Sequence, residues 1–126
     1  MKAVTIITAL LMLLSCREKA TPVLYSDLIR SWSAAVKNKQ YDQVRKYELY
    51  QKTDGEYEEI YSEYYLKDVI VLSVEEISAS ERSLKIAGKI VMRNGNLESE
   101  FAGDVRLEAD SSGTFRIKDR KIVRMR

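Results

Sequence analysis

The chain has 126 residues, of which 45% are hydrophobic and 32% charged, and its formal net charge is +2 at pH 7. These values are typical of one globular domain, exclude a disordered or fibrous chain, and give no reason to expect nucleic acid as a partner. The sequence contains no His and only one Cys. This excludes a Cys/His zinc site and the usual Ser-His-Asp and Cys-His catalytic systems.

The N-terminal segment has one charged residue, Lys2, followed by an apolar run from Ala3 to Leu14. Twelve residues are too few to cross about 30 Å of hydrocarbon comfortably, whereas they match the apolar region of a secretory signal. A retained membrane helix and a buried N-terminal element are the alternatives.

Residues 13–16, Leu-Leu-Ser-Cys, resemble the lipobox of bacterial lipoproteins, in which a small residue precedes a cysteine that becomes the lipidated N-terminus. Leu14 stands where the family pattern usually has a small or β-branched residue. The resemblance implies that residues 1–15 are a lipoprotein signal peptide and that Cys16 carries a diacylglyceryl thioether, with palmitate as a typical acyl chain. Two or more acyl chains hold a protein firmly on a membrane.

Residues 16–21 are then the lipidated Cys and a short tether, which keeps the domain within roughly 20 Å of the bilayer. Arg17 follows the lipidation site. In enterobacterial lipoproteins, which this segment resembles, an Asp at that position favours retention in the inner membrane. The resemblance therefore implies a lipid-anchored protein of the cell envelope, on the outer membrane or cell surface rather than the inner membrane.

The mature chain begins with a helical pattern that runs from Pro22 to Asn38. Apolar residues there recur at intervals of three and four, as on one buried helix face. A second short helix is predicted from Tyr41 to about Leu49. A third is predicted from about Gly55 to Tyr65, with Asp54 as its cap. The buried faces are assigned to Leu24, Leu28, Ile29, Trp32, Ala35 and Val36, to Tyr41, Val44, Tyr47 and Leu49, and to Tyr57, Ile60, Tyr61 and Tyr64.

From Lys67 onward the apolar residues alternate with polar ones, which predicts strands. The predicted strands cover residues 68–78, 84–93, 97–108, 115–118 and 121–125. Turns are predicted at Asn94-Gly95, at residues 110–113 and at Asp119-Arg120. Helices followed by strands predict an α+β domain in which the N-terminal helices pack on one curved antiparallel meander of four or five strands.

Three features carry a resemblance to a known superfamily: an early helix with Trp32 and Ala35, the segment KNKQYDQVRKY, and the closing segment GTFRIKDRKIVRM. Together they resemble the cystatin-like/NTF2-like superfamily, particularly small bacterial lipoproteins in which such a domain follows a lipobox. The resemblance implies that residues 22–126 form a single NTF2-like domain. A helix-plus-meander domain outside the superfamily is the alternative.

The superfamily often has a pocket between helices and sheet, and all eight tyrosines fall in the predicted helical half. The resemblance implies a candidate site for an apolar ligand with one or two polar groups, lined by Trp32, Tyr57, Tyr61, Tyr64 and Phe101. Alternatively, the tyrosines fill the helix–sheet interface and direct their hydroxyls to water.

Metal, cofactor and catalytic sites are not expected. The carboxylates between Asp54 and Glu63 are spread around a helix and do not converge as calcium ligands do. Enzymes of the superfamily place an Asp, Tyr or His in the cone, the space between the helices and the sheet. Asp42 or Asp68 with a nearby Tyr would match this arrangement only if the aspartate were buried and its pKa raised.

Basic residues are concentrated at the C-terminus. They predict a contact with anionic lipid headgroups or an acidic envelope protein, or else an ordinary solvated hairpin whose charges discourage edge pairing. The residues are Arg116, Lys118, Arg120, Lys121 and Arg124. The sequence thus favours a non-catalytic binding domain on a membrane-anchored envelope lipoprotein. A small-ligand carrier or an NTF2-like enzyme using the tyrosine-lined cone is the alternative.

Overall fold

The computed structural model describes residues 25–125. The predicted signal peptide of residues 1–15, the lipidation of Cys16 and the tether lie outside the described residues, as does Leu24. A helix through residues 25–37 comes first, followed by α2 (Tyr41–Tyr47) and α3 (Asp54–Tyr61). In the described part of the chain, no helix is both long and apolar enough to cross a membrane.

The helix through residues 25–37 buries the face predicted from its spacing. Ile29, Trp32, Ala35 and Val36 are each at most 3% exposed, and Leu28 is partly buried. The helix ends where Lys39 adopts a left-handed conformation, with φ of 53°. Its C-terminal carbonyls at Val36 and Lys37 accept hydrogen bonds from the Arg93 guanidinium, at 2.8 and 3.2 Å.

Helix α3 differs from its prediction at both ends. Its cap is Thr53 rather than Asp54, and Thr53 forms a capping box with Glu56. A hydroxyl at the N-cap and a glutamate three residues later satisfy two backbone donors reciprocally, which fixes the start of the helix. The helix ends at Tyr61, so the prediction that it reaches Tyr65 is wrong.

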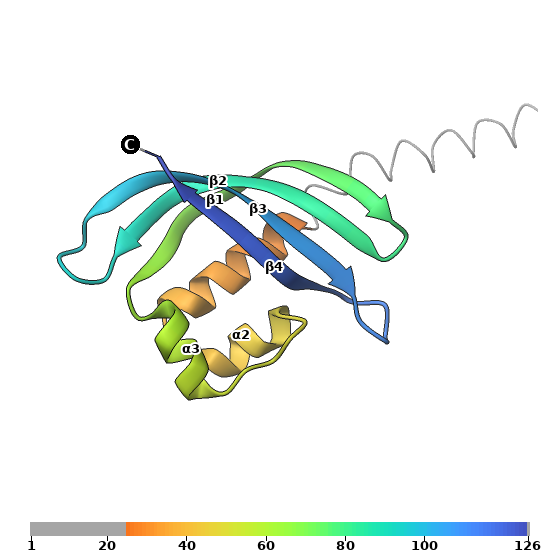
Figure 1. Cartoon of the computed structure of the whole chain (residues 1–126), viewed down its shortest axis with the longest axis horizontal. Helices are drawn as coiled ribbons and strands as arrows, with labels where there is room; N and C mark the ends of the chain where they lie inside the picture. The colour runs from red at the N-terminus through yellow and green to blue at the C-terminus, as the bar shows by residue number, and fades with distance from the viewer. Residues whose placement is uncertain (1–24, 126) are drawn as a thin grey trace, which may run out of the picture.

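The sheet has four antiparallel strands in the order β1-β2-β3-β4, and it arches over the helices (Figure 1). The strands are β1 (Tyr64–Ser78), β2 (Glu81–Met92), β3 (Glu98–Ala109) and β4 (Phe115–Arg124). Strand β1 therefore takes in Tyr64 and Tyr65, which corrects the prediction that every tyrosine lies in the helical half. The α+β fold class, with helices packed on a curved meander, is confirmed.

Bulges in β1 bend the sheet, because three register shifts along its pairing with β2 each place an additional residue on β1. At the first shift Asp68 has φ of 51°. Gly88 lies opposite, where an added Cβ would come within 2.9 Å of the Asp68 and Lys67 carbonyl oxygens. A side chain at position 88 would clash with the bulge, so this glycine permits the close approach of the two strands.

Two of the predicted turns are revised. The positive φ angles of the β2–β3 connection belong to Gly95 and Asn96, not Asn94. Leu97, where a strand was predicted to begin, is 65% exposed and precedes β3, which starts at Glu98. The predicted turn at Asp119-Arg120 is absent, because β4 runs without interruption from residue 115 to 124. The turn at residues 110–113 is confirmed, and the Asp110 carboxylate accepts hydrogen bonds from the Ser112 and Thr114 backbone N–H groups, at 2.9 and 3.1 Å.

Candidate functional site

Four of the five predicted ligand-binding residues are deeply buried between the helices and the concave face of the sheet. Trp32, Tyr57, Tyr61 and Phe101 are each at most 2% exposed, and Tyr64 is partly buried. Tyr57 and Tyr61 lie with their rings nearly parallel and their centroids 6.2 Å apart. The aromatic rings thus occupy the space in which the superfamily resemblance implies a pocket.

A buried carboxylate, Glu48, lies among these rings. The residue directly follows α2 and pairs with Ile117 of β4 in an isolated parallel bridge, and the adjacent Leu49 N–H donates to the Ile117 carbonyl at 2.8 Å. This short piece of extended backbone ties the loop to the sheet. Glu48 is only 4% exposed, and a buried carboxylate must be compensated by hydrogen bonds or charge.

The compensation comes from two of the predicted site residues. The Trp32 indole N–H donates to Glu48 Oε2 at 2.9 Å, and the Tyr61 hydroxyl donates to the same oxygen at 2.8 Å. Burial raises the pKa of Tyr61 well above its ordinary value, with the Glu48 charge and hydrogen bond acting in the same direction. Tyr61 therefore remains a neutral donor to Glu48 across the physiological range.

Arg120 of β4 supplies the nearby positive charge. Its guanidinium carbon lies 4.8 Å from the centre of the Tyr61 ring and 5.5 Å from that of the Trp32 ring, within the range of cation–π attraction. The cation thus covers the two rings that hold Glu48. The same residues border a small, partly open cavity of about 10 Å³, which has room for about one water molecule. It is lined by Trp32, Ser33, Val36, Tyr61, Tyr64, Tyr65, Leu66 and Arg120.

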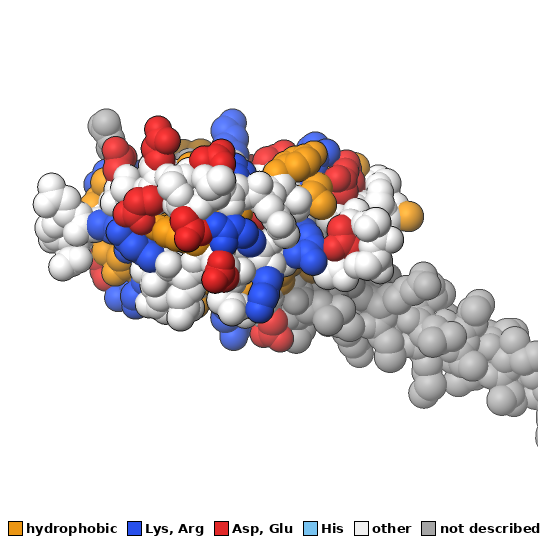
Figure 2. All heavy atoms as spheres, turned by 90° about the horizontal axis from the view of Figure 1, so that it is seen from below, with side chains coloured by type: hydrophobic (Ala, Val, Ile, Leu, Met, Phe, Trp, Pro, Cys, Tyr) orange, Lys and Arg blue, Asp and Glu red, His pale blue; other side chains and the backbone are white. Residues whose placement is uncertain are grey.

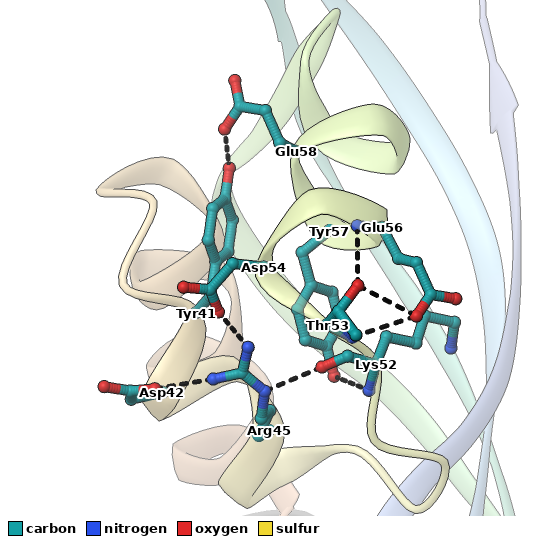
Figure 3. A network of polar contacts seen from close by, with 9 residues as sticks. All are labelled: Tyr41, Asp42, Arg45, Lys52, Thr53, Asp54, Glu56, Tyr57 and Glu58. Carbon is teal, nitrogen blue, oxygen red and sulfur yellow. Dashed lines mark hydrogen bonds and ion pairs between the residues drawn. The ribbon is translucent and has the colours of Figure 1, made fainter.

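A second polar network lies on the surface where α2, the loop after it and α3 meet (Figure 3). Arg45 is its centre: the guanidinium contacts Asp42 at 2.6 Å, forms an ion pair with Asp54, and donates to the Lys52 carbonyl at 2.7 Å. It also lies 5.5 Å from the centre of the Tyr57 ring. These contacts attach the loop to both helices.

The upper part of the same network joins α2 to α3 through Glu58. This carboxylate accepts a hydrogen bond from the Tyr41 hydroxyl and forms an ion pair with Lys39 at 2.7 Å (Figure 3 draws the Tyr41 contact). Burial, together with the hydrogen bond to Glu58 and its charge, raises the pKa of Tyr41 to about 12. Tyr41 is partly buried, Lys39 and Glu58 are about half exposed, and the three groups are paired with one another. These contacts hold α2 against α3.

The two aspartates weighed as catalytic groups are not in the cone. The Asp42 side chain is 91% exposed and contacts Arg45, and Asp68 lies exposed at the bulge in β1. Neither side chain is buried, as a general base of this type would have to be. Within residues 25–125, no three His, Cys, Asp or Glu side chains are grouped so that they could hold a metal ion.

The basic residues of the C-terminal strand contact different side chains, which separates them from one another. Arg116 pairs with Asp110 at 2.6 Å, Lys118 lies 3.4 and 3.5 Å from Glu81 and Glu108, and Arg120 is stacked at the cone. The exposed cations of the set are Lys121 and Arg124. Figure 2 shows that acidic and basic side chains are also interspersed on the face seen from below.

Sequence reasoning missed two residues that organise the site. Glu48 does not belong to a periodic hydrophobic pattern. It lies between Tyr47 and Leu49, however, and these apolar neighbours could have suggested a buried carboxylate. Arg93 follows a strand and suggests solvent exposure, yet its guanidinium joins the first helix to the Tyr61 carbonyl, to which it donates at 2.9 Å.

Comparisons with known proteins give similarity in structure only, since no protein-family model and no curated protein matches the sequence. A ketosteroid isomerase-like protein from Erwinia carotovora atroseptica SCRI1043 superposes with a TM-score of 0.60 at 10% identity, over 79% of this chain and 92% of that one. An NTF2-like protein from Cytophaga hutchinsonii ATCC 33406 gives 0.57 at 12% identity, over 79% and 93%. A conserved protein from Planctomyces limnophilus DSM 3776 gives 0.57 at 8% identity, over 86% and 99%. The chain therefore has the NTF2-like fold.

Proposed function

We propose that the chain is a membrane-anchored lipoprotein of the bacterial cell envelope whose NTF2-like domain is a non-catalytic binding module. The observation that supports binding on the outer surface is the filled cone of the described residues, 25–125. There Trp32 and Tyr61 both donate to Glu48, and the cavity beside them has room for about one water molecule. A ligand-sized pocket is usually several hundred Å³. The envelope location rests on the sequence around Cys16.

Glu48 favours a second candidate, a carrier or enzyme that uses the cone. A buried carboxylate beside a tyrosine hydroxyl is a common arrangement for proton transfer. However, both donors to Glu48 come from rings that fill the cone, so a substrate would have to displace Trp32 or Tyr61 to reach it. This arrangement supports a structural role for Glu48 in the resting protein.

Native mass spectrometry of the full chain, released from membranes in detergent, separates the two candidates. The binding module is expected to carry its lipid at Cys16 and no other small molecule. A stoichiometric second ligand that is lost in a Tyr61→Phe variant would contradict it and favour the carrier or enzyme.

The anchoring part of the proposal has its own test in Cys16→Ala. We expect this variant to fold and to lose both its palmitate label and its retention in the membrane fraction, because Cys16 precedes the domain predicted for residues 22–126. Retained label, or retention of the unlabelled variant in membranes, would contradict lipid anchoring. A Ser15→Ala variant keeps a small residue before Cys16 and serves as the matched control.

A further inference from the structure

The first helix and the edge of β1 form an open groove of about 520 Å³ on the side of the domain away from β4. The helix contributes Arg30, Ser33, Ala34 and Lys37, and β1 contributes Leu66, Lys67, Asp68, Val69 and Ile70. Strand β1 is at one end of the sheet order (Figure 1). Consecutive strand residues point to opposite faces, so a groove bordered by all five residues 66–70 runs along the strand's edge.

An exposed strand edge presents backbone N–H and C=O groups that an extended peptide can pair with. Among the described residues, only β2 pairs with β1 in the sheet. The bulge at Asp68 bends this edge and shortens the run of groups available to a partner. A short extended segment is therefore a better fit than a long strand.

The helical wall of the groove determines the charge of the partner. Within residues 25–125, no carboxylate forms an ion pair with Arg30 or Lys37, whereas Lys67 is paired with Glu98 at 2.9 Å. Arg30 and Lys37 lie two turns apart on one helix, about 10 Å along its axis. Both are exposed, and the Lys37 ammonium also lies 5.6 Å from the centre of the Tyr65 ring. They present two positive charges beside the strand edge that no carboxylate of the described residues neutralises.

The exposed side chains of β1 determine which residue types a partner would have on the face that is turned away from the helix cations. Ile70 is 54% exposed and Leu72 is 60% exposed, so two large apolar side chains face solvent close together on the edge strand. A peptide added beside β1 would direct alternate side chains toward the helix cations and toward these apolar residues. We propose, building on the binding role above, that this groove binds a short extended segment of a partner protein in which acidic and apolar residues alternate.

The test uses a fluorescent octapeptide that alternates valine and glutamate, titrated against the full chain in nonionic detergent and followed by anisotropy. We expect saturable binding that weakens as salt is raised. The double variant Arg30→Glu/Lys37→Glu is expected to lose at least tenfold in affinity and to bind an octapeptide that alternates valine and lysine. Lys121→Glu/Arg124→Glu makes the same change in net charge on the opposite edge strand and is expected to bind like the wild type.

Three results would overturn the proposal. The first is an equal loss of affinity in the Lys121/Arg124 variant, which would indicate a general charge effect. The second is undiminished binding of a peptide N-methylated at every backbone amide, which has no N–H group left to donate to a strand edge. The third is no binding of the valine–glutamate peptide while phosphatidylglycerol vesicles bind through Arg30 and Lys37, which would assign the groove to a membrane surface. None of these results removes the wider binding role, which is tested by the mass spectrum of the full chain.

Discussion

The buried network around Glu48 and the surface network around Arg45 are built from the same kinds of groups but in different surroundings. Each contains a tyrosine hydroxyl and an arginine, with one carboxylate in the buried network and three in the surface network, Asp42, Asp54 and Glu58. Around Glu48, bulk water is excluded, so a donor left without its acceptor costs desolvation free energy. Around Arg45, water and salt compete with every ion pair. We therefore expect the stability of the fold to depend more on the interior network, although the surface network has more members.

Trp32→Ala tests the interior network with the largest expected effect. The change removes a ring that is 1% exposed together with one of the donors to Glu48. We expect a loss of about 3 to 5 kcal/mol in the free energy of unfolding, measured by denaturant melts that follow circular dichroism. A loss below about 1 kcal/mol would remove Trp32 from the core.

Glu48→Ala is expected to follow, with a loss of roughly 2 to 4 kcal/mol, because it leaves both the Trp32 N–H and the Tyr61 hydroxyl without their acceptor. Glu48→Gln is the matched control, since its amide keeps an acceptor oxygen of nearly the same shape. Unfolding measurements should rank the alanine variant as less stable than the glutamine variant. Equal stability of the two variants and the wild type would show that the hydrogen bonds at Glu48 contribute nothing.

Alkaline pH acts on both networks through their tyrosines. The folded protein raises the pKa of Tyr41 to about 12 and that of Tyr61 further, whereas an unfolded tyrosine titrates near 10. Above pH 10 the unfolded chain releases protons that the folded chain keeps, so stability present below pH 10 is lost as the pH rises toward 12. Denaturant melts between pH 8 and 12 should show this loss, and Tyr41→Phe should reduce its slope. An unchanged slope in that variant would exclude Tyr41 as a cause.

The smallest effects are expected in the surface network. Thr53→Ala removes the capping box of α3 and should cost about 1 kcal/mol. Asp54→Asn removes an exposed ion pair with Arg45 and should cost less than about 0.5 kcal/mol. Thermal melts of the two variants side by side would measure the difference, and a reversed order would contradict the assignment of Thr53 as the cap.

Much of the fold could be predicted because local pattern and tertiary packing agree there. The spacing of Ile29, Trp32 and Val36 gave a buried helix face, and alternation from residue 84 onward gave the central strands. The prediction failed at Tyr64. Its spacing from Tyr57 and Tyr61 happens to continue the helical pattern, although Tyr64 is the first residue of β1. Sequence periodicity does not show that Ser62 already ends the helix.

The candidate site was only partly predictable for a different reason. Trp32 and Tyr61 were identified as large aromatic residues, but their acceptor was not, because a lone glutamate is normally exposed. Asp119 and Arg120 suggested a turn because both are polar. In the structure Asp119 pairs in register with Arg106, while Arg120 turns inward onto two rings. Such residues depend on partners far away in sequence, which a local pattern does not contain.

The filling of the cone can be probed directly through Trp32, because it is the only tryptophan in the chain. The measurement is its fluorescence in the full chain, with acrylamide as quencher, before and after addition of an apolar probe such as dodecanoate. We expect emission at short wavelength, weak quenching, and no change with the probe. Strong quenching, or a shift that saturates with dodecanoate and disappears in Tyr61→Phe, would show that the cone opens to ligands and would contradict the account.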